Sequence, residues 1–260
     1  MRIALTIAGS DSGAGAGIQA DLKTFAAHGV YGTCAITAVT AQNTLGVTAA
    51  DVLRPDLVRA QIAAVASDLA PHAAKTGMLA SAAVVETVAE AVAELGIPFL
   101  VVDPVMIAKS GASLLDESAL NALRNRLLPV AHVVTPNIPE AEALTGLTIR
   151  TDHDRQEAAR RLVGLGARAA IVKGGHLATS DIVDLLFDGQ DFAEFRHERI
   201  PGRHTHGTGC TFAAAIAAHL AQGRRLEEAV PLAQYYVAGA IRHAPDLGRG
   251  HGPMDHFWMR

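Results

Sequence analysis

Short apolar runs alternate along the chain with longer segments in which apolar positions recur every three or four residues. The short runs have the length of buried strands, whereas the longer spacing is typical of amphipathic helices. We expect strands at 2–9, 32–42, 72–78, 99–104, 132–137 and 169–175, and helices at 17–28, 56–69, 82–95, 117–128, 139–145 and 154–164. Apolar strands separated by helices predict an α/β fold, with a mostly parallel sheet covered on both faces.

Turn-forming residues support these boundaries. Gly96, Gly146 and Gly166 follow three of the expected helices as C-terminal stops. Asp188-Gly189 predicts the turn of a hairpin over 181–200, and two further helices are expected at 210–222 and 226–243. The 260 residues predict one domain, 1–260, and we expect no fused second enzyme.

Charge and composition narrow the class of partner. The formal net charge is −4 and the two signs are mixed along the chain, which argues against a nucleic-acid or membrane partner. The first apolar run breaks at Gly9-Ser10-Asp11, before a signal peptide could form, and no apolar run of membrane-spanning length follows. We expect a cytoplasmic protein that binds a small molecule. Its two cysteines, Cys34 and Cys210, are too few for a disulfide framework.

Polar side chains gather where the expected strands end. They are Asp11, Gln42, Asp103, Asn137 and Lys173. Open α/β sheets bind ligands beyond the carboxyl ends of their strands, so five such residues together predict a site there. The alternative for any one of them is an ordinary role in ending a strand or entering a loop.

The segment "GTGCT" (207–211) opens an alanine-rich expected helix. Its glycines allow backbone N–H groups to converge beside the positive end of the helix dipole, which predicts an anion cradle for a phosphate. The phosphate loop with the pattern Gly-x4-Gly-Lys-Ser/Thr is absent from the chain. The same dipole is expected to lower the pKa of Cys210 and make it a base or nucleophile. The alternative is a small apolar cysteine packed under the loop.

Seven segments occur in one collinear order over nearly the whole chain: "TIAGSDSGAGAGIQADLKTF" (6–25), "AVTAQNTLGV" (38–47), "KTGML" (75–79), "VVDPVMIAKSG" (101–111), "TPNIPEAEALTG" (135–146), "KGGH" (173–176) and "HGTGCT" (206–211). Together they resemble the hydroxymethylpyrimidine/phosphomethylpyrimidine kinases of thiamine biosynthesis, in the ribokinase-like superfamily. The resemblance implies a ribokinase-like three-layer α/β/α domain. It also implies a homodimeric kinase that uses ATP and Mg²⁺.

The resemblance implies roles at the phosphate end of the site. Cys210 takes the position where most relatives carry an aspartate base, and Gly207, Thr208 and Gly209 form the anion hole. The implied magnesium and nucleotide residues are Asp103 and Glu140 for the metal, and Asn137, Lys173 and Thr208 for the nucleotide. Hard oxygen ligands suit magnesium. The alternative for Glu140 is stabilisation of a helix dipole after Pro139.

At the substrate end, the resemblance implies that Gln42 recognises the pyrimidine, because an amide can donate and accept together. Met78 and Val105 are the implied apolar walls, or else ordinary core residues. Gly9 and Asp21 are implied to shape or close this end, although Asp21 could simply pair with a helix dipole.

Two positions depart from the family pattern. Ala14 stands where glycine is usual, which we expect to be tolerated unless the residue needs a positive φ. Gln234 stands where relatives often carry lysine, which puts a phosphate or adenine contact in doubt. A metal held by His204 and His206 is a minor alternative, because no third ligand accompanies them. Two rival functions stay open: a pyridoxal or pyridoxine kinase, and a non-catalytic regulator that binds a pyrimidine or nucleotide.

Overall fold

One sheet of nine strands runs through the residues that the computed structural model describes, 1–106, 116–175 and 181–260. The strands are β1 (Ile3–Asp11), β2 (Tyr31–Asn43), β3 (Gly46–Val52), β4 (Ala73–Thr76), β5 (Leu100–Val102), β6 (Val133–Val134), β7 (Ala170–Val172), β8 (Asp181–Phe187) and β9 (Phe192–Glu198). Their order is β3-β2-β1-β4-β5-β6-β7-β8-β9. From β2 to β7 all neighbours are parallel, and β3 and β8 pair antiparallel with β2 and β7. Residues 107–111 and His176 of the quoted motifs lie outside the described residues.

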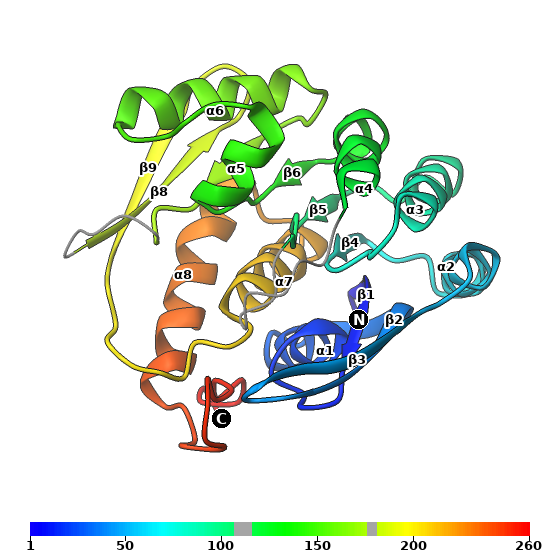
Figure 1. Cartoon of the computed structure of the whole chain (residues 1–260), viewed down its shortest axis with the longest axis horizontal. Coiled ribbons are helices and arrows are strands. Elements are labelled where there is room, and N and C mark those ends of the chain that lie inside the picture. Colours follow the sequence, from blue (N-terminus) through cyan, green and yellow to red (C-terminus); the bar gives the residue numbers. More distant parts are fainter. Residues whose placement is uncertain (107–115, 176–180) are drawn as a thin grey trace.

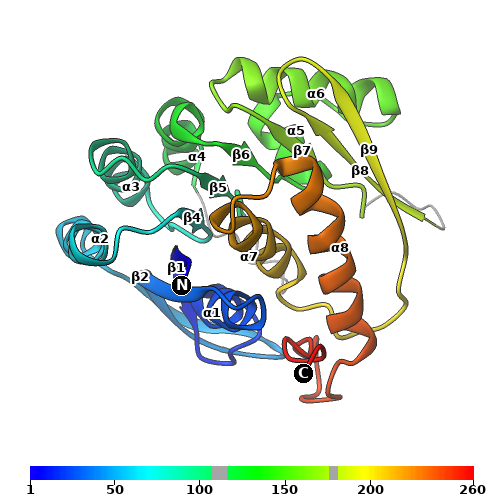
Figure 2. The ribbon, with the colours of Figure 1, turned by 180° about the vertical axis from the view of Figure 1, so that it is seen from behind.

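Helices cover both faces of the sheet (Figures 1 and 2). One face carries α1 (Gly17–Ala27), α7 (Thr208–Ala221) and α8 (Leu226–Arg242). The other carries α2 (Pro55–Leu69), α3 (Ala82–Glu94), α4 (Glu117–Ala122), α5 (Ile138–Thr145) and α6 (Asp152–Gly164). Each face has its own buried apolar cluster, so the predicted three-layer α/β/α fold is confirmed.

Helix α7 is the most enclosed of the described helices. Every residue from Thr211 to Ala221 is buried, because small alanine side chains let the helix lie close to the sheet and to α1 and α8. The helix runs with its N-terminus toward the carboxyl ends of the parallel strands (Figure 1). This arrangement brings the glycine-bearing segment before α7 to the edge where the polar residues were predicted.

Local chemistry explains the element boundaries. Gly96, Gly146 and Gly166 adopt φ of +63°, +71° and +113° directly after their helices, as expected for helix stops. At the hairpin turn, the Asp188 carboxylate accepts the N–H groups of Gln190 and Asp191 at 2.8 and 2.7 Å. None of the described helices is long and apolar enough to cross a membrane.

Two expectations for the elements were wrong. Strand β3 was not predicted, because five of its seven residues are exposed and it has no apolar face to reveal it. The helix expected over 117–128 keeps α-helical geometry only to Ala122. It continues as a wider π turn over Leu123–Leu127 and a 3-10 turn over Leu128–Val130, where Pro129 lacks the N–H that an α-helix needs.

Candidate active site

The mouth of α7 forms an open cradle of backbone donors. Gly207 adopts a left-handed φ of +83°, and a Cβ atom on it would lie 1.9 Å from the Gly15 carbonyl oxygen, so only glycine fits. Thr208 begins the helix, and its hydroxyl donates to the Thr205 carbonyl at 3.2 Å. The amides of Gly209 and Cys210 point out of the first turn, where a helix has no internal acceptors. The N-terminus of α7 therefore has the free backbone donors that the predicted anion cradle would use.

A cluster of charged side chains faces this cradle from the ends of β5 and β7. A Cβ atom on Gly209 would lie 3.5 Å from Lys173 Nζ and 3.7 Å from Asp103 Oδ2. Lys173 Nζ lies 3.4 Å from Asp103 Oδ1. Burial alone would lower the pKa of Lys173, but the carboxylates of Asp103 and Glu140 outweigh it and raise that pKa. Lys173 and the carboxylates of Asp103 and Glu140 therefore lie together beside the start of α7.

Glu140 joins the cluster from the first turn of α5. Its carboxylate accepts the Asn137 N–H at 2.8 Å, and the Asn137 side chain accepts the Glu140 N–H at 3.0 Å, which makes a capping box. Burial raises the pKa of Glu140 to about 7; the Lys173 ammonium opposes this rise and the Asp103 carboxylate adds to it. Asn137 is also bridged to Lys173 through the backbone. The predicted nucleotide and metal residues are therefore neighbours.

The donor set fits a magnesium ion. Asp103 Oδ2 is buried and has no hydrogen-bond partner among the described residues. Magnesium usually takes one or two protein carboxylates and fills its remaining positions with water and phosphate oxygens. Within the described residues no group of three or more His, Cys, Asp or Glu side chains could hold a metal. Asp103 and Glu140 would therefore leave most of the coordination shell to the nucleotide and water.

Cys210 stands between the two ends of the site. It is half-buried, and the Gly17 N–H donates to its sulfur. Burial raises its pKa to about 11; the Lys75 ammonium opposes the rise, and the carboxylates of Asp103 and Asp21 add to it. The expected lowering of the Cys210 pKa was therefore wrong, because burial and two carboxylates raise it.

A fully buried ion pair lies beneath the thiol. Lys75 Nζ contacts the two carboxylate oxygens of Asp21 at 3.0 and 2.9 Å, and the Thr6 hydroxyl donates to the same carboxylate at 2.6 Å. Both charged side chains are completely inaccessible to solvent. Asp21 therefore acts on the site through Lys75 and has no surface for a ligand. Sequence reasoning missed Lys75, although a lysine within the short buried strand β4 was a usable signal.

The residues predicted as the apolar wall lie near Gly9, in β1, and beyond β5. A Cβ atom on Gly9 would lie 2.8 Å from Met78 Cε, so glycine leaves the room that the half-buried methionine occupies. The Met78 carbonyl accepts the Thr37 hydroxyl at 2.6 Å, which fixes its backbone. Val105 is half-buried two residues beyond Asp103. The structure brings Gly9 and Met78 together, and it places Val105 at the same edge of the sheet.

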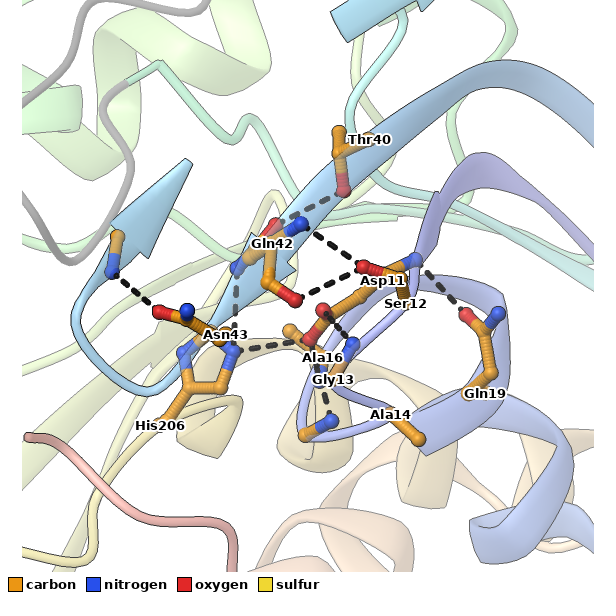
Figure 3. A network of polar contacts seen from close by, with 12 residues as sticks. Asp11, Ser12, Gly13, Ala14, Ala16, Gln19, Thr40, Gln42, Asn43 and His206 are labelled. Atoms are coloured by element: carbon orange, nitrogen blue, oxygen red, sulfur yellow. Dashed lines mark hydrogen bonds and ion pairs between the residues drawn. The ribbon is translucent and has the colours of Figure 1, made fainter. Parts of the chain in front are cut away.

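A polar network joins Asp11, Gln42 and His206 at the substrate end, where pyrimidine recognition was predicted and which is called the pyrimidine end below (Figure 3). The Asp11 carboxylate accepts the N–H groups of Gly13, Gly15 and Ala16 at 2.8, 3.1 and 2.9 Å, and it lies 2.9 Å from His206 Nε2. Burial would raise the Asp11 pKa, but the hydrogen bonds from His206 and these amides hold it below its ordinary value. Gln42 faces His206, with 3.2 Å between the side-chain nitrogens. The sequence did not predict this contact between His206 and Gln42, because the two residues are 164 positions apart.

The two departures from the family pattern have structural consequences. Ala14 adopts φ of +58°, the conformation in which its tolerance was in doubt. Gln234 is buried and donates to Asp184 at 2.8 Å, and Asp184 in turn accepts the Gly174 N–H at 2.9 Å. Gln234 therefore helps to fix Asp184, which in turn holds the backbone of Gly174, the residue after Lys173. His204 pairs instead with Asp246 at 2.9 Å, away from the Asp11 carboxylate that His206 contacts.

Comparison with known proteins gives a consistent family. A family model described as phosphomethylpyrimidine kinase matches residues 11–255. The thiamine biosynthesis bifunctional protein ThiED of Geobacter sulfurreducens is 54% identical over 97% of this chain, which spans about half (52%) of that protein's length. The hydroxymethylpyrimidine/phosphomethylpyrimidine kinase of Bacillus subtilis is 52% identical, with 98% of this chain and 94% of that protein covered.

Solved structures with the same fold include kinases named for two kinds of substrate. An ADP complex of Bacillus subtilis pyridoxal kinase has a TM-score of 0.92 at 39% identity and covers 100% of this chain and 98% of its own. A phosphomethylpyrimidine kinase from Clostridium difficile has a TM-score of 0.83 at 43% identity and covers 93% of this chain and 100% of its own. Because both superpose well, the choice between their substrates depends on the side chains of the site.

Proposed function

Because the chain belongs to the phosphomethylpyrimidine kinase family, we propose that it transfers phosphate from ATP to the alcohol of 4-amino-5-hydroxymethyl-2-methylpyrimidine and then to the resulting monophosphate. The proposal depends on one observation: Lys173 and Asp103 face the backbone donors at the start of α7. A Cβ atom on Gly209 would lie 3.5 Å from Lys173 Nζ and 3.7 Å from Asp103 Oδ2. Phosphoryl transfer depends mainly on positioning and on compensation of the charge that develops, and this arrangement supplies both.

Each residue of the phosphate end has a role in this reaction. The Gly209 and Cys210 amides donate to the transferring phosphoryl group, and Lys173 neutralises nucleotide phosphate charge. A magnesium ion held by Asp103 and Glu140 would offset phosphate charge when bound. The Cys210 thiolate takes the proton from the attacking alcohol. Lys75 favours that thiolate electrostatically, and Asp21 keeps the ammonium in place.

The pyrimidine end favours an aminopyrimidine over a vitamin B6 alcohol. Gln42 offers one donor and one acceptor on a single flat edge, which complements an exocyclic amine beside a ring nitrogen. Met78 beside Gly9 provides an apolar surface for the ring. The 52% identity to the Bacillus subtilis relative named hydroxymethylpyrimidine/phosphomethylpyrimidine kinase agrees with this choice.

A coupled ADP-release assay with both alcohols tests the proposal. We expect turnover with the aminopyrimidine alcohol to exceed turnover with pyridoxine, and the pyrimidine monophosphate to be a second substrate. A preference for pyridoxine would make the chain a vitamin B6 kinase. Tight pyrimidine binding without ADP release would instead support a non-catalytic regulator.

The proposal includes two further points. We place the activity in the cytoplasm, where ATP is available, and we expect a homodimer, as the family resemblance implies. Light scattering on the purified chain over a range of concentrations measures the second point directly. A mass of one chain, 27.1 kDa, at all concentrations would contradict the homodimer.

A further inference from the structure

The Gln42 side chain is held at both ends by neighbours that fix how it can donate and accept. One end of its amide lies 3.2 Å from His206 Nε2, and the other lies 3.1 Å from Thr40 Oγ1 (Figure 3). The oxygen and nitrogen of an amide have nearly the same shape, so their positions are assigned from the hydrogen-bond network. Each of the two neighbours provides an independent assignment.

The Asp11 end of the network determines where His206 carries its hydrogen. An ionised carboxylate only accepts, and Asp11 already accepts three backbone N–H groups. His206 Nε2, 2.9 Å from Asp11 Oδ2, must therefore be a donor. A nitrogen that carries a hydrogen cannot accept from an amide N–H. Figure 3 places the Gln42 nitrogen at this end, but the contact requires the other assignment of the amide, with its carbonyl oxygen toward His206.

The Thr40 end leads to the same orientation. The Thr40 hydroxyl has one hydrogen, and it lies 3.0 Å from the Ser10 carbonyl oxygen, which can only accept. The structure places Gln42 Oε1 3.1 Å from this hydroxyl, but the one hydrogen goes to Ser10, so the Thr40 oxygen accepts from that end of the Gln42 amide. That end is the NH₂ group. Two unrelated neighbours thus select one of the two possible amide orientations.

The partners of Gln42 have little freedom to adjust. A Cβ atom on Gly15 would lie 2.4 Å from His206 Cδ2, so the imidazole packs directly on the glycine loop. The backbone of His206 is bridged to Pro253. The backbone N–H of Gln42 donates to the Ser12 hydroxyl and the backbone carbonyl of Gln42 accepts from it, both at 2.8 Å, which fixes the backbone that carries the side-chain amide. The amide is therefore held in a rigid frame.

We propose that His206, anchored by Asp11, is a specificity-determining positioning residue that locks the orientation of the Gln42 amide. The locked amide presents one carbonyl lone pair and one N–H to the ring in a fixed order, which matches the amine and ring nitrogen of an aminopyrimidine. A free amide could turn over and serve a ring with a different pattern of donors and acceptors. The identity of the preferred ring rests on the proposed function, whereas the locking rests on the network itself.

The test compares kcat/KM for the 4-aminopyrimidine alcohol with that for the same alcohol without the amino group. In His206→Leu we expect the ratio of the two to fall by about tenfold, because the freed amide no longer rejects the wrong pattern. His206→Gln places an N–H donor near the same point and should recover most of the ratio. His204→Leu is the matched control, because this neighbouring histidine pairs with Asp246 and should leave the ratio unchanged.

Thr40→Val tests the other end of the amide without altering His206, and it should also lower the ratio. An unchanged ratio in a folded His206→Leu protein, or an equal loss with both alcohols, would overturn the proposal. If His206→Leu does not fold, an unchanged ratio in Thr40→Val overturns it. If the wild type prefers pyridoxine, the proposed function fails. In that case the ratio of pyridoxine turnover to pyrimidine turnover should still move toward one in His206→Leu and in Thr40→Val. If this ratio does not change, the proposal that His206 fixes the Gln42 amide is overturned.

Discussion

At the pyrimidine end of the site, Asp11 receives four hydrogen bonds and the Gln42 amide is held at both ends. At the phosphate end, one buried oxygen of Asp103 has no partner among the described residues, and burial raises the pKa of Glu140 to about 7. Polar groups at the first end are satisfied before any ligand arrives. At the phosphate end, the carboxylates of Asp103 and Glu140 lie close together, and Lys173 only partly offsets their negative charge.

The contrast follows from the chemistry of the two ligands. A flat, uncharged ring offers a few hydrogen bonds, so it is bound selectively only if the protein's donors and acceptors are already fixed. A nucleotide and its metal bring several charges of both signs, which complete the electrostatics on arrival. Substitutions at the phosphate end should therefore change turnover strongly, whereas those at the pyrimidine end should change selectivity.

The largest effect is expected for Cys210→Ala. Removal of a positioned base should slow phosphorylation of the alcohol by about 10²–10⁴-fold. The second substrate attacks through a phosphate oxygen that is already largely ionised near neutrality, since its second pKa is about 6, so that step should be slowed much less. Separate rates for the alcohol and the monophosphate measure the difference.

The pH dependence provides the control for this prediction. With a Cys210 pKa of about 11, the thiol is protonated at neutral pH and the thiolate fraction grows as pH rises. The wild-type rate with the alcohol should therefore rise with pH across the neutral and mildly alkaline range, and Cys210→Ala should lose this rise. Equal losses in both phosphorylation steps would show that Cys210 acts through loop geometry.

The second effect concerns the ion pair beneath the thiol. Lys75→Met leaves the Asp21 carboxylate buried with only the Thr6 hydroxyl, which should lower the free energy of unfolding by about 3–5 kcal/mol. The double variant with Asp21→Asn should regain part of this loss, because it removes the unpaired charge. Urea titration measures both.

A surface pair offers the matched control for Lys75. Arg126 and Glu90 lie 3.3 Å apart with half-exposed side chains, so Arg126→Met should cost less than about 1 kcal/mol. A loss in Lys75→Met as small as that in Arg126→Met would mean that solvent reaches the Asp21 carboxylate, contrary to its complete burial.

The third effect separates metal binding from helix capping. Glu140→Gln keeps an oxygen that can accept the Asn137 N–H but removes the charge, and it should raise the magnesium concentration needed for half-maximal turnover by about 10–100-fold. Asp154→Asn makes the same change in the capping box at the start of α6, whose hydrogen bonds are exposed and include no residue of the charged cluster. If the two variants have the same magnesium requirement, Glu140 has only a capping role.

The sequence predicted the two ends of the site unequally. Asp103, Lys173 and the 207–210 segment were found because charged residues and glycines at strand and helix ends are visible in one dimension. The contact between His206 and Gln42 joins residues 164 positions apart, and only folding brings them together. The sign of the Cys210 pKa shift was mispredicted for the same reason, because the burial that raises this pKa, and the carboxylates of Asp103 and Asp21 that add to the rise, come from distant segments.

The fold was predictable where burial leaves a pattern. The parallel strands β1, β5 and β7 are mostly apolar runs, and glycines follow three of the helices, as the structure confirms. Strand β3 lacks such a pattern because it pairs through its backbone at the exposed edge of the sheet. Backbone pairing at an edge is not encoded in hydrophobicity, so a hydrophobic pattern does not reveal it.

The smallest expected effect sharpens the comparison at the pyrimidine end. Ala14 adopts φ of +58° within the loop whose amides Asp11 holds, and Ala70 adopts φ of +44° at the end of α2, in another part of the fold. A left-handed alanine is strained by about 1 kcal/mol, and part of the gain on changing it to glycine is lost to the greater entropy of the unfolded chain. Ala14→Gly and Ala70→Gly should therefore each raise the free energy of unfolding by less than about 1 kcal/mol.

Pyrimidine binding then distinguishes the two variants. If the hydrogen bonds to Asp11 hold the loop, Ala14→Gly should leave the affinity within about twofold of wild type, as in Ala70→Gly, because the Gly13, Gly15 and Ala16 amides remain bound. If the Ala14 methyl group restrains the loop, glycine should loosen it and weaken binding several-fold in Ala14→Gly alone. Isothermal titration of the pyrimidine into both variants measures the affinities. A selective loss in Ala14→Gly would show that the pyrimidine end depends on a strained residue as well as on its hydrogen bonds.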